Sequence, residues 1–360
     1  MRRREHSSDG VRRAQGLAGL SPAYFGLVMA TGIVSLAASM MAYRGLGLAL
    51  FYLNIVQYAA LWVLYGARAW RYPRRFFGDM GVHATGPGYF TVVAATGILA
   101  SQFILLEGGV VIGAGLFLLS ALLWVVLTYA IFIALTVKRR KPHLDKGIGG
   151  GWLLAVVATQ AVCVSAALLA ARTGQPFRIE LNLAALTLWL WGGMLYIWMI
   201  SLIFYRYMFF RFAPRDLAPP YWIDMGAMAI STLAGALLIT NAIDDAPYLA
   251  SLLPFLKGIT MLYWATGTWW IPMLVLLEVW RYGYVRTRIE YDPLLWGAVF
   301  PLGMYAVCTW QMDAVMGFGF LAGLSHAFLW AALVAWIVTF AGMMHVLFRG
   351  LVRRRRGSSA

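Results

Sequence analysis

The residue types that carry catalysis or metal binding are few in this chain and lie far apart. The five histidines are His6, His83, His143, His326 and His345. His143 and Asp145 are close neighbours, but a lone pair in a basic loop is ordinarily solvated, and Cys163 and Cys308 lie inside apolar runs. Because an active site or metal site needs a cluster of such groups, we expect no enzyme activity, no metal and no cofactor.

A second group of residues could control passage rather than reaction. One segment reads Trp296-Gly297-Ala298-Val299-Phe300-Pro301-Leu302-Gly303. Pro301 removes a backbone hydrogen bond and clashes with the preceding turn, so a helix here should kink. A large ring such as Phe300, facing small residues across a narrow passage, would act as a plug. The alternative is a core aromatic residue beside a proline kink.

The elements that would position these residues are membrane-spanning helices. Hydrophobic residues make up 62% of the 360 and charged residues only 12%, too few to cover a soluble surface. A spanning helix needs about 20 mostly apolar residues. Ten such segments are predicted, at 22–43, 48–66, 87–106, 109–137, 149–171, 181–205, 221–243, 248–277, 293–312 and 317–348. The eighth is interrupted by Gly267 and Pro272. The chain is therefore predicted to be an all-α integral membrane protein.

The 29 Lys and Arg residues indicate the orientation of these spans. Twenty-five of them fall in the two tails or in the loops after spans 2, 4, 6 and 8. The opposite loops hold Arg44, Arg172 and Arg178, and Lys257 lies within span 8. Because basic loops stay in the cytoplasm, both termini should be cytoplasmic in a bacterial-type inner membrane. The predicted organisation is a basic tail at 1–19, a transmembrane domain at 20–348 and a basic tail at 349–360.

The formal charge of +15 is thus explained by topology, and we expect no nucleic-acid partner. Binding of anionic lipid or substrate by the basic loops is the alternative role for these residues.

An internal repeat marks the odd-numbered spans. Pro22-Ala23-Tyr24-Phe25, followed by Ala30-Thr31-Gly32-Ile33, recurs 65 residues later as Pro87-Gly88-Tyr89-Phe90 and Ala95-Thr96-Gly97-Ile98. Weaker copies open spans 5, 7 and 9, at Gly150-Gly151-Trp152, Pro220-Tyr221-Trp222 and Pro293-Leu294-Leu295-Trp296. The repeat predicts five helix hairpins. Glycines at mid-depth favour close approach or open space, so the odd helices should lie inside, lining a pore, and the even helices outside against lipid. Helix packing alone is the other interpretation of these glycines.

Charge within the odd spans is sparse. The N-termini of all five should face the cytoplasm, where their dipoles favour anions. Proton-driven carriers commonly hold an ionisable residue inside the membrane. Here the candidates are Asp224, near the start of span 7, and Asp292, at the start of span 9. Both lie where a carboxylate caps or complements a helix N-terminus, so we expect capping rather than proton transfer.

Alignment of the odd spans on their opening residue shows which residues should lie at the same depth along the bundle axis. Phe300 then stands level with Met29, Ala94, Val157 and Ala227, and Gly32 and Gly97 are expected across the axis. Phe300 is the predicted gate and Pro301 the predicted kink. The predicted pore lining consists of Gly26, Met29, Gly32, Ala94, Gly97, Val157, Ala227, Trp296 and Gly303.

These motifs resemble the slow-type anion channel, tellurite-resistance and malic-acid transporter family. The likeness rests on Pro22 to Gly26 with Thr31-Gly32, on Trp296 to Gly303, and on the ten-helix layout. It implies hairpins in quasi-fivefold order, a homotrimer of independent pores, and a gate at Phe300 with Gly26 or Gly32 opposite. Members of that family pass chloride, nitrate, sulfite or malate-type dicarboxylates, and some are linked to tellurite resistance.

Two transport functions therefore stay open. The first is a passive pathway for small anions such as chloride or nitrate. The second is a secondary transporter of C4-dicarboxylates, sulfite or tellurite-related oxyanions, with or without proton coupling. The sparse charge inside the membrane favours the first.

Overall fold

The computed structural model describes residues 16–357 except 173–175, 245–246 and 287–290, and these residues form helices and loops without a strand. The long helices are α1 (Gly26–Met40), α2 (Arg44–Arg71), α4 (Phe90–Leu106), α5 (Val110–Thr136), α7 (Leu154–Ala170), α8 (Arg178–Phe209), α9 (Ile223–Asp244), α11 (Leu253–Glu278), α12 (Trp296–Met316) and α13 (Ala322–Gly357). The short helices are α3 (Pro73–Met80), α6 (Leu144–Gly147) and α10 (Pro247–Ala250), and a π-helix follows α11 at Val279–Tyr284.

The ten predicted spans are confirmed, because ten helices in the described residues are long and apolar enough to cross a membrane. Their limits differ from the prediction mainly in the even spans. Span 6 extends to Arg178–Phe209, and span 8 begins at Leu253, after the separate helix α10. The expected interruption of span 8 is wrong, since α11 continues through Pro272. Spanning helices tolerate proline because neighbouring helices and local adjustment satisfy the freed backbone groups.

Each odd span opens with a 3-10 turn before its α-helix, and these turns are the repeated motif of the sequence. They are Pro22–Phe25, Gly86–Tyr89, Gly150–Leu153, Pro219–Trp222 and Pro293–Leu295. Proline suits a first turn because its missing N–H would be unpaired there anyway. The Ser21 hydroxyl accepts a hydrogen bond from the Ala23 N–H at 3.2 Å, and the Asp292 carboxylate accepts one from the Leu294 N–H at 2.7 Å. Asp292 therefore caps its helix, as predicted.

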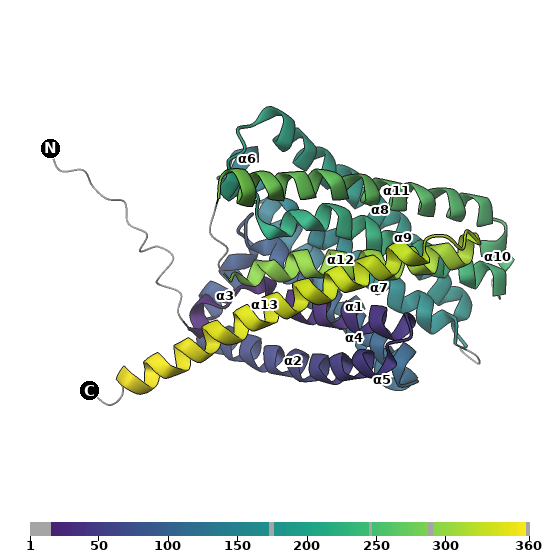
Figure 1. Ribbon diagram of the computed structural model, residues 1–360, viewed down its shortest axis with the longest axis horizontal. Coiled ribbons are helices and arrows are strands. Elements are labelled where there is room, and N and C mark those ends of the chain that lie inside the picture. The colour runs from purple at the N-terminus through teal and green to yellow at the C-terminus, as the bar shows by residue number, and fades with distance from the viewer. Residues whose placement is uncertain (1–15, 173–175, 245–246, 287–290, 358–360) are drawn as a thin grey trace.

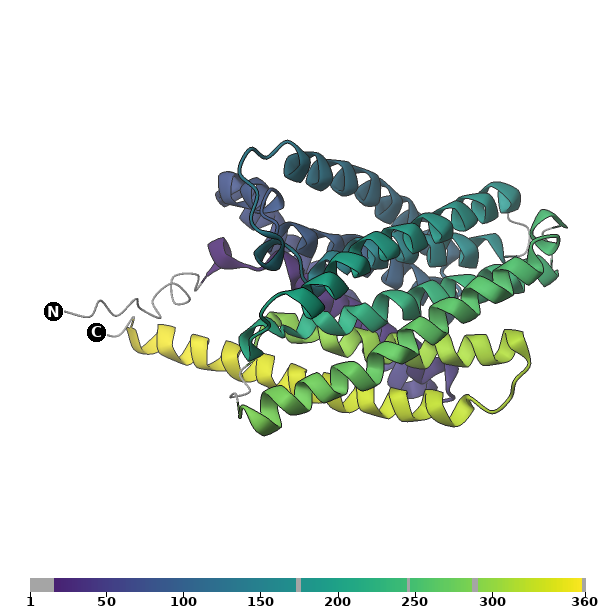
Figure 2. The same cartoon turned by 90° about the horizontal axis from the view of Figure 1, so that it is seen from above.

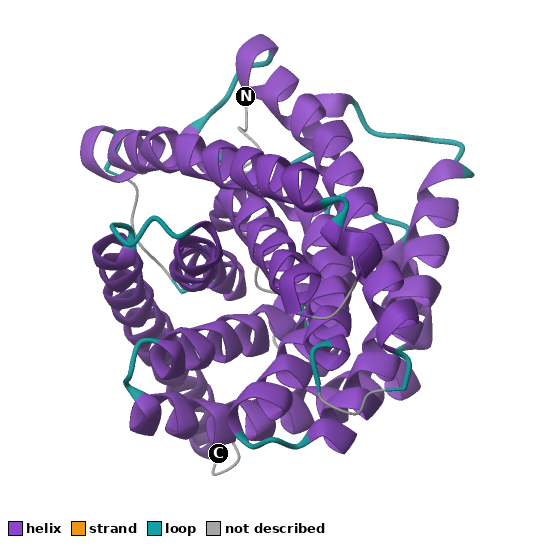
Figure 3. Ribbon diagram, turned by 90° about the vertical axis from the view of Figure 1, so that its right-hand side faces the viewer, coloured by secondary structure: helices purple, strands orange, loops and turns teal. Residues whose placement is uncertain are grey.

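The odd helices lie inside the bundle and the even helices outside. The most apolar windows of the odd spans are 61% to 100% buried, against 17% to 44% for the even spans. Many large apolar side chains on α5, α8 and α13 are exposed, as lipid-facing surfaces require. Figure 3 shows the helices close to end-on.

The inner helices form a closed ring. α1 packs on α4, α4 on α7, α7 on α9, α9 on α12, and α12 returns to α1. Each also packs on the next long helix of the chain, so the five hairpins are α1–α2, α4–α5, α7–α8, α9–α11 and α12–α13. The quasi-fivefold symmetry of this order stays a prediction. α3 and α6 lie at one end of the bundle, which we call the basic end, and α10 lies at the other (Figure 1). Figure 2 shows the same long bundle from above.

Hydrogen bonds from aromatic side chains tie each outer helix to the inner helix of the next hairpin. Trp124 Nε1 donates to Thr159 at 2.8 Å, and Trp336 Nε1 of the last helix donates to Thr31 of the first at 2.9 Å. The other three contacts are Tyr58 with Thr96, Trp189 with the Ser231 carbonyl and Trp264 with Thr309, at 2.9, 2.8 and 3.0 Å. The threonine of the sequence repeat thus joins neighbouring hairpins, and the last hairpin to the first.

Candidate functional site

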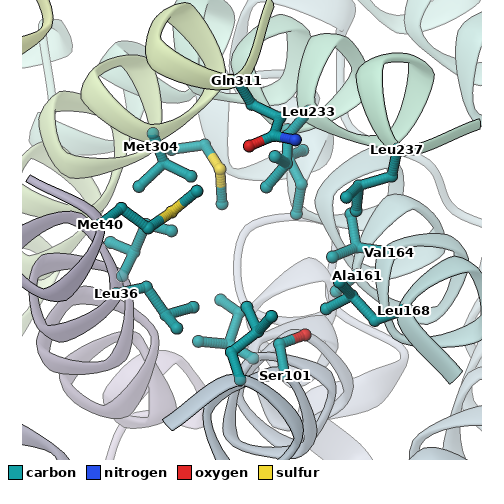
Figure 4. A pocket seen from close by; sticks show the side chains of 15 residues that line it. Leu36, Met40, Ser101, Ala161, Val164, Leu168, Leu233, Leu237, Met304 and Gln311 are labelled. Carbon is teal, nitrogen blue, oxygen red and sulfur yellow. The ribbon is translucent and has the colours of Figure 1, made fainter. Parts of the chain in front are cut away.

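Two cavities lie on the inner face of the ring of odd helices. The wide cavity, of about 650 Å³, is lined by the opening turns of these helices and by loops 83–85 and 146–152 at the basic end. The narrow cavity, of about 120 Å³, lies further along the same helices (Figure 4). The five inner helices therefore present one lined face to both cavities.

The narrow cavity takes three residues from every inner helix, always at positions i, i+3 and i+7. They are Ile33, Leu36 and Met40; Ile98, Ser101 and Leu105; Ala161, Val164 and Leu168; Ile230, Leu233 and Leu237; Met304, Val307 and Gln311. Positions i, i+3 and i+7 share one face of a helix, so the five helices present equivalent faces to a common axis. This spacing supports the predicted order of the hairpins. Only Ser101 and Gln311 offer polar side chains.

Phe300 stands between the two cavities. Its side chain is 1% exposed and lines the wide cavity, while Met304, one helical turn further on, lines the narrow one. Met29 and Ile33 on α1 have the same relation. The ring of Phe300 thus belongs to the section in which the wide cavity ends and the narrow one begins.

The residues expected level with Phe300 lie in this section between the two cavities, which we call the closed section. Met29, Ala94, Val157 and Phe300 each lie four residues before the first narrow-cavity residue of their helix. Ala94 and Val157 are fully buried and line neither cavity. On α9 the equivalent position is Gly226, one residue before the expected Ala227. The weak repeat on this helix kept only its opening and could not fix the register to one residue.

Three other residues of the predicted lining face the wide cavity or its base. Gly26, Met29 and Trp296 all line it, and a Cβ added to Gly26 would meet the Trp296 Cβ at 3.4 Å. This is an ordinary contact distance, so Gly26 leaves room beside the Trp296 side chain. The family likeness placed Gly26 or Gly32 opposite the gate, and of the two only Gly26 lines this cavity.

Gly32, Gly97 and Gly303 lie at helix contacts rather than along either cavity. A Cβ on Gly32 would come within 2.6 Å of Ile98, and one on Gly97 within 2.9 Å of the Ala161 carbonyl oxygen. A Cβ on Gly303 would come within 2.9 Å of Ile33. Such distances are shorter than side chains tolerate, so these glycines let neighbouring inner helices touch. Gly32 and Gly97 are therefore not exposed to Phe300 across an open axis.

Pro301 lies inside α12, which stays helical on both sides of it. A Cβ on Gly226 of α9 would come within 2.7 Å of the Pro301 ring. The ring that follows Phe300 thus packs against a position where only glycine fits, which holds α12 against α9 at this level. The kink itself stays a prediction.

Charged side chains gather around the wide cavity and not around the narrow one. Arg206, Lys146, His83, Asp216 and Asp292 line the wide cavity. Burial lowers the pKa of His83, and nearby Lys138 and Lys141 lower it further. His83 is therefore mainly neutral near pH 7.

Arg206 was missed as a site residue by the sequence reasoning, which assigned it to a cytoplasmic loop. In the structure it belongs to the last turn of α8 and is buried. The available signal was the order of residue types, an arginine near the end of an even span followed by a tyrosine in the next opening turn, which Arg206 and Tyr221 share with Arg68 and Tyr89.

Asp224 lies in the first turn of α9, where a carboxylate complements the helix N-terminus, as expected. It is fully buried, its Oδ2 accepts a hydrogen bond from the Tyr207 hydroxyl at 2.9 Å, and its Oδ1 has no partner among the described residues. It lines neither cavity. In the described residues no group of three His, Cys, Asp or Glu side chains could hold a metal ion.

Comparisons with known proteins agree with this architecture. The family model described as voltage-dependent anion channel matches residues 19–344. An uncharacterized membrane protein of Mycobacterium tuberculosis is 36% identical over 166 residues, which is 46% of this chain and 83% of the relative. Two uncharacterized transporters of Methanocaldococcus jannaschii are each 22% identical, over 91% and 92% of this chain and 94% of their own length.

Family membership implies anion transport across a membrane, and the relatives' names are those of membrane proteins and transporters rather than enzymes. With a family model that spans nearly all of the transmembrane helices, this chain belongs to the voltage-dependent anion channel family, which includes the tellurite-resistance and malic-acid transporters.

Proposed function

We propose that the protein is a passive pathway for small anions of the chloride or nitrate kind, closed at Phe300. The observation that carries this proposal is the shared face of the five inner helices, which lines a cavity on each side of the Phe300 level. Removal of one ring would join two existing cavities without a rearrangement of the bundle.

The electrostatics of the pathway support anions over cations. Arg206 and Lys146 line the wide cavity together with Asp216 and Asp292, whose carboxylates each accept a hydrogen bond from a backbone N–H. The N-termini of the inner helices, which carry positive partial charge, also surround this cavity. No carboxylate lines the narrow cavity. An anion would therefore be attracted at one end and held weakly along the rest, which conduction requires.

The test is current through purified protein in a planar bilayer under a salt gradient. Phe300→Ala should carry a steady current whose reversal potential lies close to the equilibrium potential of the anion. A reversal potential near that of potassium would refute the anion pathway.

The surroundings of the pathway are proposed with it. We infer a bacterial-type inner membrane with the basic end in the cytoplasm, anionic lipid against the basic loops and a homotrimer of independent pores. Reporter fusions after Arg75 and after Gly108 should face opposite sides of the membrane. The same sidedness for both would contradict this orientation.

Asp224 favours a second candidate, a proton-coupled transporter of C4-dicarboxylates, sulfite or tellurite-related oxyanions. A buried carboxyl group with one oxygen unpartnered among the described residues is the kind of group that carries protons within membranes. Uptake into vesicles that stops on collapse of a proton gradient, and is lost in Asp224→Asn, would favour this candidate. Uptake that is independent of the gradient would exclude it.

A further inference from the structure

A buried arginine near the end of α8 lines the wide cavity without a carboxylate partner. Arg206 is 8% exposed, and its Nη1 donates to the Ile148 carbonyl oxygen at 3.0 Å and to the Tyr221 hydroxyl. Its guanidinium carbon lies 5.4 Å from the centre of the Phe212 ring. Among the described residues, no Asp or Glu comes within salt-bridge distance of it. A buried charge without a counter-ion is unfavourable, so a compensating anion would be stabilising.

Arg68 occupies the matching place in the first hairpin and differs in this respect. It lies near the end of α2 and donates to Tyr89 in the next opening turn, as Arg206 donates to Tyr221. Arg68, however, also pairs with Asp79 and lines neither cavity. The same contact between hairpins is therefore neutralised by the protein in one place and left positive in the other.

Two nitrogens of the Arg206 guanidinium donate to no described residue, and together they form one edge of the group. Both hydrogen bonds of Arg206 come from Nη1, and neither Nε nor Nη2 donates to a described residue. The Nε of Arg68 is fully enclosed without a partner, whereas no atom of Arg206 is. The Nε–Nη2 edge presents two parallel N–H groups, and this geometry matches two oxygens of a carboxylate or another oxyanion.

Other charged groups of the wide cavity have partners of their own. Lys146 lies 3.8 Å from Asp145, and the Asp216 carboxylate accepts a hydrogen bond from the Ala213 N–H at 2.9 Å. The Gly149 to Gly151 loop runs past the guanidinium, and a Cβ on Gly149 would lie 3.6 Å from Arg206 Nη1. A side chain at position 149 would therefore reach the charge.

We propose that Arg206 binds an oxyanion in the wide cavity through this edge, before the anion reaches Phe300. The ligand class is a small anion with two oxygens on one side, such as nitrate or a carboxylate, in preference to a halide. The inference rests on the proposed anion pathway and gives it a selective entry step.

The decisive variant supplies the missing carboxylate from the chain itself. Gly149→Asp places an acid beside Arg206, on a backbone with φ −171°, which any residue can adopt. Gly78→Asp is the matched control, because it adds the same charge at the same end of the bundle, outside the lining of the wide cavity, where a Cβ would meet no atom within 4 Å. Unfolding can be followed with a thiol-reactive dye, since Cys163 and Cys308 are both buried.

The experiment replaces chloride by nitrate, and separately by acetate, at constant ionic strength. Wild type and Gly78→Asp should gain roughly 2 °C in melting temperature at about ten times the dissociation constant, in a saturable way. Gly149→Asp should melt higher than Gly78→Asp in chloride and gain nothing further. Because nitrate and acetate differ in their general effects on proteins, a gain common to both reports the site.

Substitutions of Arg206 give a second measurement if an aspartate at position 149 prevents folding. Arg206→Lys keeps the charge and lacks the fork, so it should lose the preference for nitrate and acetate over chloride. The proposal is overturned if Gly149→Asp or Arg206→Lys responds to the anions as wild type does, or if wild type shows no saturable response.

Current through Phe300→Ala separates this inference from the proposed function. Anion-selective current with a flat melting response defeats the Arg206 site alone. A saturable response that Gly149→Asp abolishes, without anion current, leaves a binding site and defeats the pathway.

Discussion

The wide and the narrow cavity are built on the same five helices, yet they offer an anion opposite surroundings. The wide cavity is lined by opening turns, by the glycines at 149–151 and by the charged side chains of Arg206, Lys146, Asp216 and Asp292. The narrow cavity has fifteen lining residues, of which only Ser101 and Gln311 are polar (Figure 4). An anion entering from the basic end would replace its bound water by polar groups of the wide cavity. Beyond Phe300, the narrow cavity offers few polar groups that could replace water.

Under the proposed anion pathway, this difference predicts where the barrier lies. If the wide end attracts the anion, the resistance to passage should come from closure and loss of hydration at and beyond Phe300. Apolar constrictions gate by excluding water, and the ring of Phe300 next to a narrow apolar cavity fits that description. The predictions below follow this comparison, from the largest expected effect to the smallest.

Removal of the Phe300 ring should have the largest effect. Phe300→Ala would join the two cavities, so bilayer conductance should rise by more than about tenfold while the protein still folds. Phe25→Ala is the matched control, because Phe25 is as fully buried but packs edge-on against Tyr58, Trp62 and Tyr65. That variant should lose about 3–5 kcal/mol of stability without a leak.

If the gate hypothesis were wrong, Phe300→Ala would behave as Phe25→Ala is expected to behave. Phe300→Ala would then melt early and conduct no more than wild type, as a truncated core residue should. Melting temperature and conductance of both variants, measured on the same preparations, decide between these outcomes.

A charge placed in the narrow cavity should change conductance severalfold. In the Phe300→Ala background, Gln311→Glu keeps the side-chain shape and should lower anion current, while Gln311→Lys should raise it. The effect should fade at about 1 M salt, where charges are screened beyond roughly 3 Å. Equal currents for the Glu and Lys variants at low salt would place the anion path elsewhere.

Glycines on the two kinds of surface should respond differently to a single methyl group. Gly97→Ala places a Cβ within 2.9 Å of the Ala161 carbonyl oxygen, so it should lose roughly 1–3 kcal/mol of stability. Gly26→Ala meets only the Trp296 Cβ at 3.4 Å and should fold normally. Thermal unfolding of both variants tests this, and a stable Gly97→Ala would show that α4 and α7 can separate there.

The smallest effect should come from pH. The pKa of His83 is lowered by burial and by Lys138 and Lys141, so the ring gains its proton only below the ordinary range of histidine. Protonation adds a positive charge at the wide cavity, and anion current should rise by less than about twofold from about pH 7 to about pH 5. His83→Gln should remove this rise. An unchanged pH response in that variant would assign it to another group.

Protonation of His83 should also lower the free energy of unfolding slightly. Because the folded pKa of His83 is lowered, the unfolded chain binds the proton at a higher pH, and stability falls as pH drops between the two values.

The sequence predicted the helices because they depend on a repeated pattern, whereas the gate at Phe300 stays a prediction. Apolar length predicted ten spans, and alignment on the opening residues put Met29, Ala94 and Val157 level with Phe300. Small residues did not reveal which face of a helix they occupy. Gly32 and Gly97 suit a pore wall and a helix contact equally well in sequence, and the structure assigns them to contacts.

The role of Arg206 could not be predicted for a similar reason. A basic residue at the end of a span reads as a topology signal whether it reaches solvent or is buried. Its burial depends on where α8 ends and on Tyr221 of the next hairpin, and both are tertiary facts.

The hydrogen bond from Trp336 to Thr31 bears on how the chain assembles. These residues lie 305 positions apart, on the tenth and the first of the spanning helices in the described residues. The threonine of the first helix finds this aromatic donor only once the tenth helix has been made. Until then, the five hairpins form an open arc with one unsealed flank. That flank could receive the tenth helix of another copy, and the covalent link between the two partners favours closure within one molecule because it raises their effective concentration.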